Sequence, residues 1–127
     1  SPDDRWIAYQ SNESGWYEIY VQPFPGTGGR SRVSTDAGTL PQWRGDGREL
    51  FYLGPDNVLM AVPLTLNSST VQAGPPAALF ATQAGFATPG GSEYAASRDG
   101  QRFLVNTQVE DPAPITILLN WRAGIER

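Results

Sequence analysis

The chain of 127 residues contains no cysteine, no histidine and no lysine. Without cysteine it forms neither disulfides nor thiolate metal sites, and without histidine it cannot assemble a Ser-His-Asp triad. All nine cationic side chains are arginines, and they are scattered singly rather than gathered into the basic stripe that follows a phosphate backbone. We therefore expect no nucleic-acid partner and no histidine-based catalysis.

The sequence also lacks a long hydrophobic run. The longest, ITILLNW at residues 115–121, is far shorter than the ~20 apolar residues of a membrane-spanning helix. No signal-peptide pattern stands at the N-terminus, although the abrupt start inside a repeated motif favours a piece cut from a longer, targeted precursor. We expect no insertion into a membrane.

Turn-forming residues, by contrast, are abundant. The chain has 14 glycines and 11 prolines, and 39% of its residues are hydrophobic. An apolar share of this size builds a core in one domain without disulfides or a metal. Dense glycine and proline between short apolar segments favours many short strands over helices. We predict an all-β fold, in one domain or in part of a larger one.

One turn motif occurs three times, as SPDD at residues 1–4, RGDG at 44–47 and SRDG at 97–100. The spacing between the three copies is close to the ~40–50 residues of a four-stranded propeller blade. The repeat predicts an antiparallel β-propeller segment of about three blades. Its approximate units are residues 1–39, 40–91 and 92–127.

Two apolar runs follow each turn, and we interpret them as consecutive strands. The first runs are residues 5–9, 48–53 and 101–106, and the second are 17–24, 58–64 and 115–121. Weaker strand candidates are residues 31–34, 40–43, 77–82 and 93–97. In the run at 17–24, Ile19, Val21 and Phe24 nearly alternate with Tyr20 and Gln22. The run at 58–64 is more continuously apolar, so we expect burial on both of its faces.

The segments SPDDRWIAY, EIYVQPF and PQWRGDGRELFY resemble the WD-type propeller repeats of the TolB-like family, which also occur in tricorn and prolyl-oligopeptidase-like proteins. YVQPFPG and ITILLNW resemble the carboxy-terminal propeller segments of bacterial serine/threonine kinases. The resemblance covers nearly the whole chain and implies a propeller fold. It also favours a periplasmic or extracytoplasmic location. Where the motif has glycine after the aspartate, the first copy has Asp4, for which we expect a slightly strained turn.

The resemblance is specific for the fold and weak for function, because propellers of this kind serve many roles. We expect a noncatalytic interaction or scaffold module. An alternative is the noncatalytic sensing or gating propeller part of a larger kinase or peptidase; a ligand site in a central channel has no specific residue support. About three blades leave two faces bare, whereas a propeller closes with at least four. Its expected partner is thus another protein or a second copy of itself, and a homodimer of three-bladed halves would form a ring of six blades.

The aspartates Asp3, Asp46 and Asp99 stand in equivalent turns. Equivalent positions in different blades keep the three carboxylates apart, so we expect each to bind amides of its own turn rather than a metal or a substrate. The glycine-rich stretches at 26–30 and 88–92 lack the Lys-Ser/Thr of a phosphate-binding loop and are interpreted as hairpin loops. We expect no catalytic residue, no metal and no cofactor.

Aromatic side chains are the remaining candidates for function. Trp43 and Trp121 lie near strand positions and are expected to pack in the core. Trp16 and Tyr17 open a strand after Gly15, and with Phe24 and Arg30 they form a set of aromatic and arginine side chains typical of protein contacts. These four residues are our candidate protein-contact site, and packing within the hairpin is the alternative.

Overall fold

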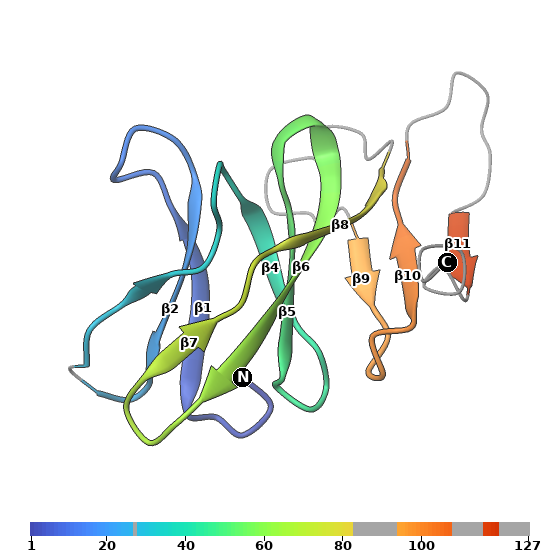
Figure 1. The fold of residues 1–127 in the computed structure, drawn as a ribbon. Coiled ribbons are helices and arrows are strands. Elements are labelled where there is room, and N and C mark those ends of the chain that lie inside the picture. Colours follow the sequence, from blue (N-terminus) through green and yellow to red (C-terminus); the bar gives the residue numbers. More distant parts are fainter. Residues whose placement is uncertain (27, 83–93, 108–115, 120–127) are drawn as a thin grey trace.

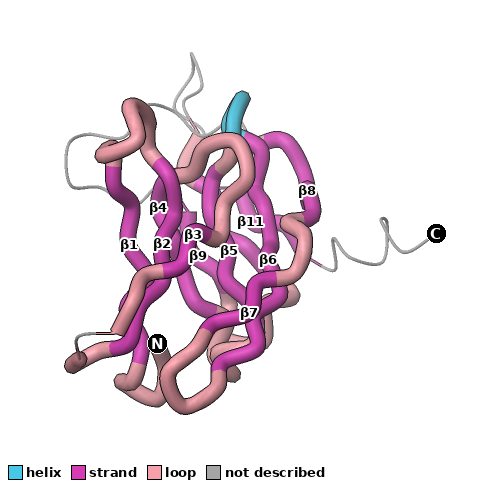
Figure 2. The backbone as a smooth tube through the Cα atoms, turned by 60° about the vertical axis from the view of Figure 1, so that its left-hand side comes forward, coloured by secondary structure: helices cyan, strands magenta, loops and turns pink. Residues whose placement is uncertain are grey.

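A computed structural model of the chain describes residues 1–26, 28–82, 94–107 and 116–119, and these form an all-β, antiparallel fold. Three separate sheets stand beside one another, and none closes on itself (Figure 1). The single helical element among the described residues is the 3-10 turn Pro55–Asn57, at the end of the molecule opposite the N-terminus (Figure 2). No helix in the described part is long and apolar enough to span a membrane.

The strands follow the chain from sheet to sheet. The first sheet contains β1 (Trp6–Ser11), β2 (Glu18–Pro23) and β3 (Ser31–Arg32). The second contains β4 (Thr39–Trp43), β5 (Glu49–Leu53), β6 (Val58–Leu66), β7 (Val71–Ala73) and β8 (Ala77–Ala81), and the third contains β9 (Tyr94–Ala96), β10 (Arg102–Val105) and β11 (Thr116–Leu119). Every strand except β7 was predicted from the sequence. The strands β7 and β8 pair with different parts of the same edge of β6, so they share one position in the sheet. The second sheet is therefore four strands wide although it contains five strands.

The second sheet is buried on both faces. Side chains alternate in direction along β5, so Leu50 and Tyr52 face the first sheet while Phe51 and Leu53 face the third. The cluster toward the first sheet consists of Trp6, Ile19, Val21, Val33, Leu50, Tyr52, Val62 and Leu64. The cluster toward the third sheet consists of Phe51, Leu53, Leu59, Ala61, Tyr94, Phe103 and Val105. Because each large buried side chain contributes about 1.5–3 kcal/mol, these two cores hold the stack together.

Two further predictions concern the core. The run at 58–64 contributes side chains to both clusters, which confirms burial on its two faces. Trp43 is half-buried and packs against the cluster toward the first sheet. Trp121 and the loop at 88–92 lie outside the described residues.

The innermost strand of the second sheet, β4, joins all three sheets. The Gln42 side chain donates to the Tyr94 carbonyl at 2.6 Å and accepts the Ala96 N–H at 3.0 Å, which extends backbone pairing to β9. The Tyr94 hydroxyl donates to the Leu40 carbonyl at 2.6 Å, and the Leu40 N–H donates to Gln10 Oε1 at 2.8 Å. Burial raises the pKa of Tyr94, which keeps this hydroxyl a donor. The two bonds also hold Leu40 at a φ of 55°, a strained value for leucine.

We predict that Gln42→Ala lowers the free energy of unfolding by about 2 kcal/mol, because it leaves a partly buried carbonyl and a partly buried N–H of β9 without this partner. Chemical denaturation measures the difference. The matched control is Gln72→Ala, since Gln72 is exposed on β7. Equal effects of the two substitutions would contradict the role of Gln42.

A second prediction concerns the first repeated turn. The residue after the aspartate has a left-handed φ in all three turns, 58° at Asp4, 74° at Gly47 and 69° at Gly100. This conformation costs a non-glycine residue on the order of 1 kcal/mol, which confirms the strain expected at Asp4. We expect Asp4→Gly to raise the unfolding free energy by up to ~1 kcal/mol. Glycine also increases the conformational entropy of the unfolded chain, which offsets part of this gain.

The reverse substitution is the control. A Cβ added at Gly47 would meet only Pro2 Cδ, at 3.7 Å, so Gly47→Asp changes backbone strain rather than packing. We expect it to destabilise the protein by a similar amount in thermal melts. Changes in unfolding free energy of opposite sign for Asp4→Gly and Gly47→Asp support backbone strain at Asp4. Changes of the same sign refute it.

Candidate functional site

The four predicted contact residues lie around the first sheet. Trp16 and Tyr17 occupy the loop before β2 and are 65% and 45% exposed, and Phe24, directly after β2, is 55% exposed. Arg30 lies in the segment before β3. All three aromatic side chains are therefore available to a partner, and packing within the hairpin does not bury them.

The structure does not gather the four residues into one patch. The six residues of β2 separate Trp16 and Tyr17 from Phe24 by about 20 Å of strand. Arg30 belongs with the loop end, because its guanidinium pairs with Glu13 at 2.6 Å. It also stacks over the Tyr20 ring at 4.7 Å, a cation-π contact. Trp16 and Tyr17 thus lie apart from Phe24, and Arg30 lies beside Glu13 and over the Tyr20 ring.

Phe24 lies on the outer face of the first sheet, which faces away from the second sheet. The sequence pattern grouped it with Ile19 and Val21, but those two side chains are buried in the core and Phe24 is exposed. Strand parity explains the difference, since positions 20, 22 and 24 share the face opposite positions 19 and 21. On this outer face the Tyr20 ring stacks on Tyr9 at 5.8 Å.

Ile7 is the second apolar side chain on this outer face. Its neighbours Trp6 and Ala8 pack against the core between the first two sheets, so Ile7 points the other way, and it is 39% exposed. Together with Phe24 it gives the outer face of the first sheet an exposed apolar surface. Ile7 is not among the contact residues predicted from the sequence.

Both residues have buried equivalents in the second sheet. Ile7 pairs with Gln22 as Leu50 pairs with Val62. Leu50 is 0% exposed. Counting two further positions along the partner strand makes Phe24 the equivalent of Leu64. The outer face of the first sheet thus carries exposed apolar side chains whose equivalents in the second sheet are buried.

The backbone supports this equivalence. The Phe24 N–H donates to the Arg5 carbonyl at 2.8 Å, and the Leu64 N–H donates to the Arg48 carbonyl at the same distance. Arg5 and Arg48 each stand two residues after the aspartate of a repeated turn. Leu64 is 5% exposed and lies in the core between the first two sheets.

The third sheet has a corresponding outer face. Phe103 and Val105 point into the core, and Leu104 points outward and is 39% exposed. A shallow hollow of about 240 Å³ lies here, with Leu104, Ala95 and Arg102 in its lining. Neither Leu104 nor Arg102 was selected from the sequence. The sequence does contain a signal for both residues, which is their distance from the aspartate of the repeated turn. This distance predicts exposure only when it is known which sheet face each position occupies.

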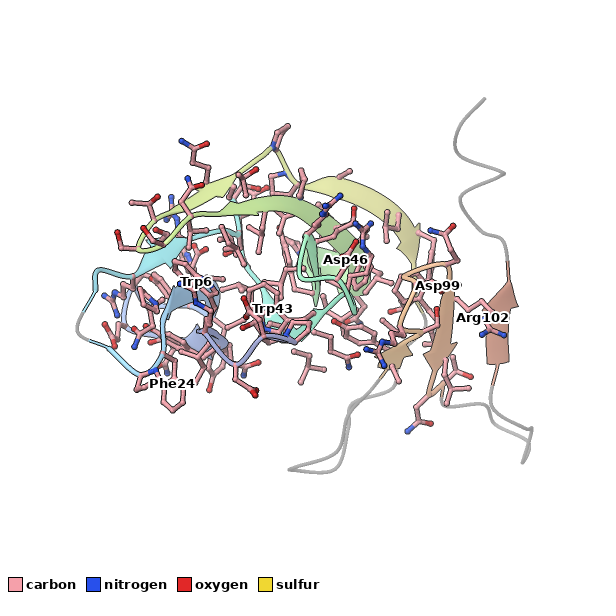
Figure 3. All side chains as sticks on the ribbon, turned by 90° about the horizontal axis from the view of Figure 1, so that it is seen from below. Trp6, Phe24, Trp43, Asp46, Asp99 and Arg102 are labelled. Carbon is pink, nitrogen blue, oxygen red and sulfur yellow. The ribbon has the colours of Figure 1, made fainter. Side chains whose placement is uncertain are left out.

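The turn aspartates bind within their own turns, as predicted. Asp46 Oδ1 accepts the Arg48 N–H at 3.0 Å, and Asp99 Oδ1 accepts the Gln101 N–H at 3.0 Å. Asp3 Oδ1 accepts a hydrogen bond from the Ser1 hydroxyl in the first turn. The three turns lie along one edge of the molecule (Figure 1), and the Asp46 and Asp99 side chains stay apart (Figure 3).

A groove of about 560 Å³ runs along this turn edge. Two carboxylates, Asp3 and Asp46, and two guanidinium groups, Arg48 and Arg98, are in its lining. These charges balance, so the groove favours neither an anion nor a cation. Within the described residues, no group of three or more acidic side chains is placed to hold a metal ion.

Glu18 is a buried carboxylate that was not selected from the sequence. It is 2% exposed, accepts a hydrogen bond from the Ser34 hydroxyl and lies 3.6 Å from the Arg32 guanidinium. The same Ser34 oxygen accepts the Ile19 N–H at 2.9 Å. These contacts fix the segment around β3 to β2, and Glu18 therefore has a structural role.

Comparison with known proteins adds no further assignment. No protein-family model matches the chain, and no curated protein matches it. The candidate site therefore rests on geometry, which places exposed apolar side chains on the outer faces of the first and third sheets.

The turn aspartates give a prediction for stability as a function of pH. Hydrogen bonds from the Arg44 guanidinium, followed by the Arg48 N–H, lower the pKa of Asp46 to about 2. The carboxylate therefore stabilises the fold above the unfolded pKa of ~3.9, and this contribution is lost as the pH falls through about 2. Because Asp46 is half-exposed, we expect at most ~1 kcal/mol.

The test compares urea denaturation of wild type and Asp46→Asn near neutral pH and at strongly acidic pH. We expect wild type to be more stable near neutrality and the difference to vanish in acid. Asp56→Asn, in the exposed 3-10 turn, controls for the loss of one negative charge. A difference that grows as the pH falls would contradict the Arg44–Asp46 contact.

Proposed function

We propose that the chain is a noncatalytic β-propeller segment of about three blades that serves as an interaction or scaffold module. This architecture is supported by three antiparallel sheets that stack face to face. The same aspartate turn lies directly before β1, between β4 and β5, and between β9 and β10. Strands occupy the same order after each turn, and the second sheet has the four-strand width of a blade.

One observation carries the functional part of the proposal. The two outermost sheet faces expose side chains whose equivalents inside the stack are buried. Ile7 and Leu104 are each 39% exposed, whereas their equivalents Leu50 and Phe51 are 0% exposed. Exposed apolar side chains at positions that are buried elsewhere in the same stack indicate a surface that binds another protein.

Site-specific photo-crosslinking in the cells that normally produce the protein tests this function. A photoreactive phenylalanine analogue replaces Ile7, Leu104 or, as the control, Ser68 in the exposed turn between β6 and β7. We expect protein adducts from positions 7 and 104 and none from position 68, because only the sheet faces bind. Adducts from neither face would overturn an interaction role, whatever the partner.

A further inference from the structure

The contact between the second and third sheets indicates what covers an outer sheet face. Phe51, on the far side of the second sheet, meets Phe103 of the third sheet edge-on, with ring centroids 4.9 Å apart. Counted from the aspartate of each repeated turn, Leu104 is the equivalent of Phe51, and Ile7 is the equivalent of Phe103. Leu104 and Ile7 therefore correspond to the two halves of one contact, and each lies exposed on an outer face.

We propose that the partner of these faces is a second copy of the chain, with the outer face of the third sheet in one copy packed on the outer face of the first sheet in the other. Leu104 then lies against Ile7. The inference rests on the proposed function and names its partner. Among the described residues, one uncovered face carries Leu104, the equivalent of Phe51, and the other carries Ile7, the equivalent of Phe103. Inside the stack, the faces that carry Phe51 and Phe103 pack together.

A second pair of positions matches in the same way. Trp6 of the first sheet and Leu64 of the second belong to one core cluster. Their equivalents on the outer faces are Arg102 and Phe24, which lie at opposite sides of the molecule (Figure 3). Docking brings the Arg102 guanidinium to the Phe24 ring, a cation-π pair. The hollow of about 240 Å³ beside Arg102 receives the ring.

Two copies suffice to satisfy both faces. Because the docking faces differ, the contact is head-to-tail, and a two-fold arrangement of two copies forms it twice. Each copy contributes three sheets, so the assembly is a ring of six. Once the first contact has formed, the second is intramolecular and gains from the resulting high effective concentration.

Paired charge substitutions test this arrangement. Ile7→Glu and Leu104→Arg each place an unpaired charge in both contacts of a homodimer, so each variant alone is expected to be monomeric by light scattering. An equimolar mixture is expected to restore the dimer, because one contact then pairs the introduced glutamate with the introduced arginine and the other is wild type. Wild type and the Ser68→Glu control are expected to be dimers, with unchanged circular dichroism spectra for all variants.

Phe24→Ala is a milder second variant, for which we expect the dimer dissociation constant to rise roughly tenfold or more. The proposal is overturned by a wild-type chain that stays monomeric at all concentrations, by a mixture that stays monomeric, or by a Leu104→Arg variant that still dimerises. Assemblies longer than two copies would overturn the ring. If position 7 crosslinks to a different protein while the purified chain is monomeric, the interaction role survives and self-association does not.

Discussion

Burial of both faces of the second sheet is the constraint on which the rest of the structure depends. Alternate residues of β5 enter two different cores, so the sheet needs a neighbour on each side. The first and third sheets meet this need, and the side chain of Gln42 ties the inner edge of the second sheet to the third. The stack is therefore held at its faces by apolar packing and along its inner edge by hydrogen bonds.

The same arrangement accounts for the two exposed faces. Packing one sheet between two others buries both faces of the middle sheet and leaves each outer sheet with one uncovered face. Counted from the aspartate of each turn, several side chains on those uncovered faces stand at positions that are buried in the second sheet. Ile7, Phe24 and Leu104 are exposed for this reason, and the acidic turns that mark the repeat are structural.

Much of the fold follows from the sequence, because strand runs and turns are local features. Composition and the repeated turn predicted the all-β class and all strands except β7, which is three residues long and lies between Ser68–Thr70 and Gly74. The contact site was harder to predict, since exposure depends on which face has a neighbour. Trp16 and Phe24 were selected as contact residues and are exposed, although the alternation in sequence groups Phe24 with the buried Ile19 and Val21. Ile7 and Leu104 look like ordinary core residues in sequence.

The alternation along β5 has a consequence for how the fold comes apart. Leu50 and Phe51 are adjacent in the chain but belong to different cores, so the sheet order makes the molecule a short linear array with coupling between neighbours. An outer sheet can open while the opposite core persists. Loss of the second sheet removes both cores in one step, so among the described strands we expect the amides of β5 and β6 to exchange more slowly than those of the two outer sheets.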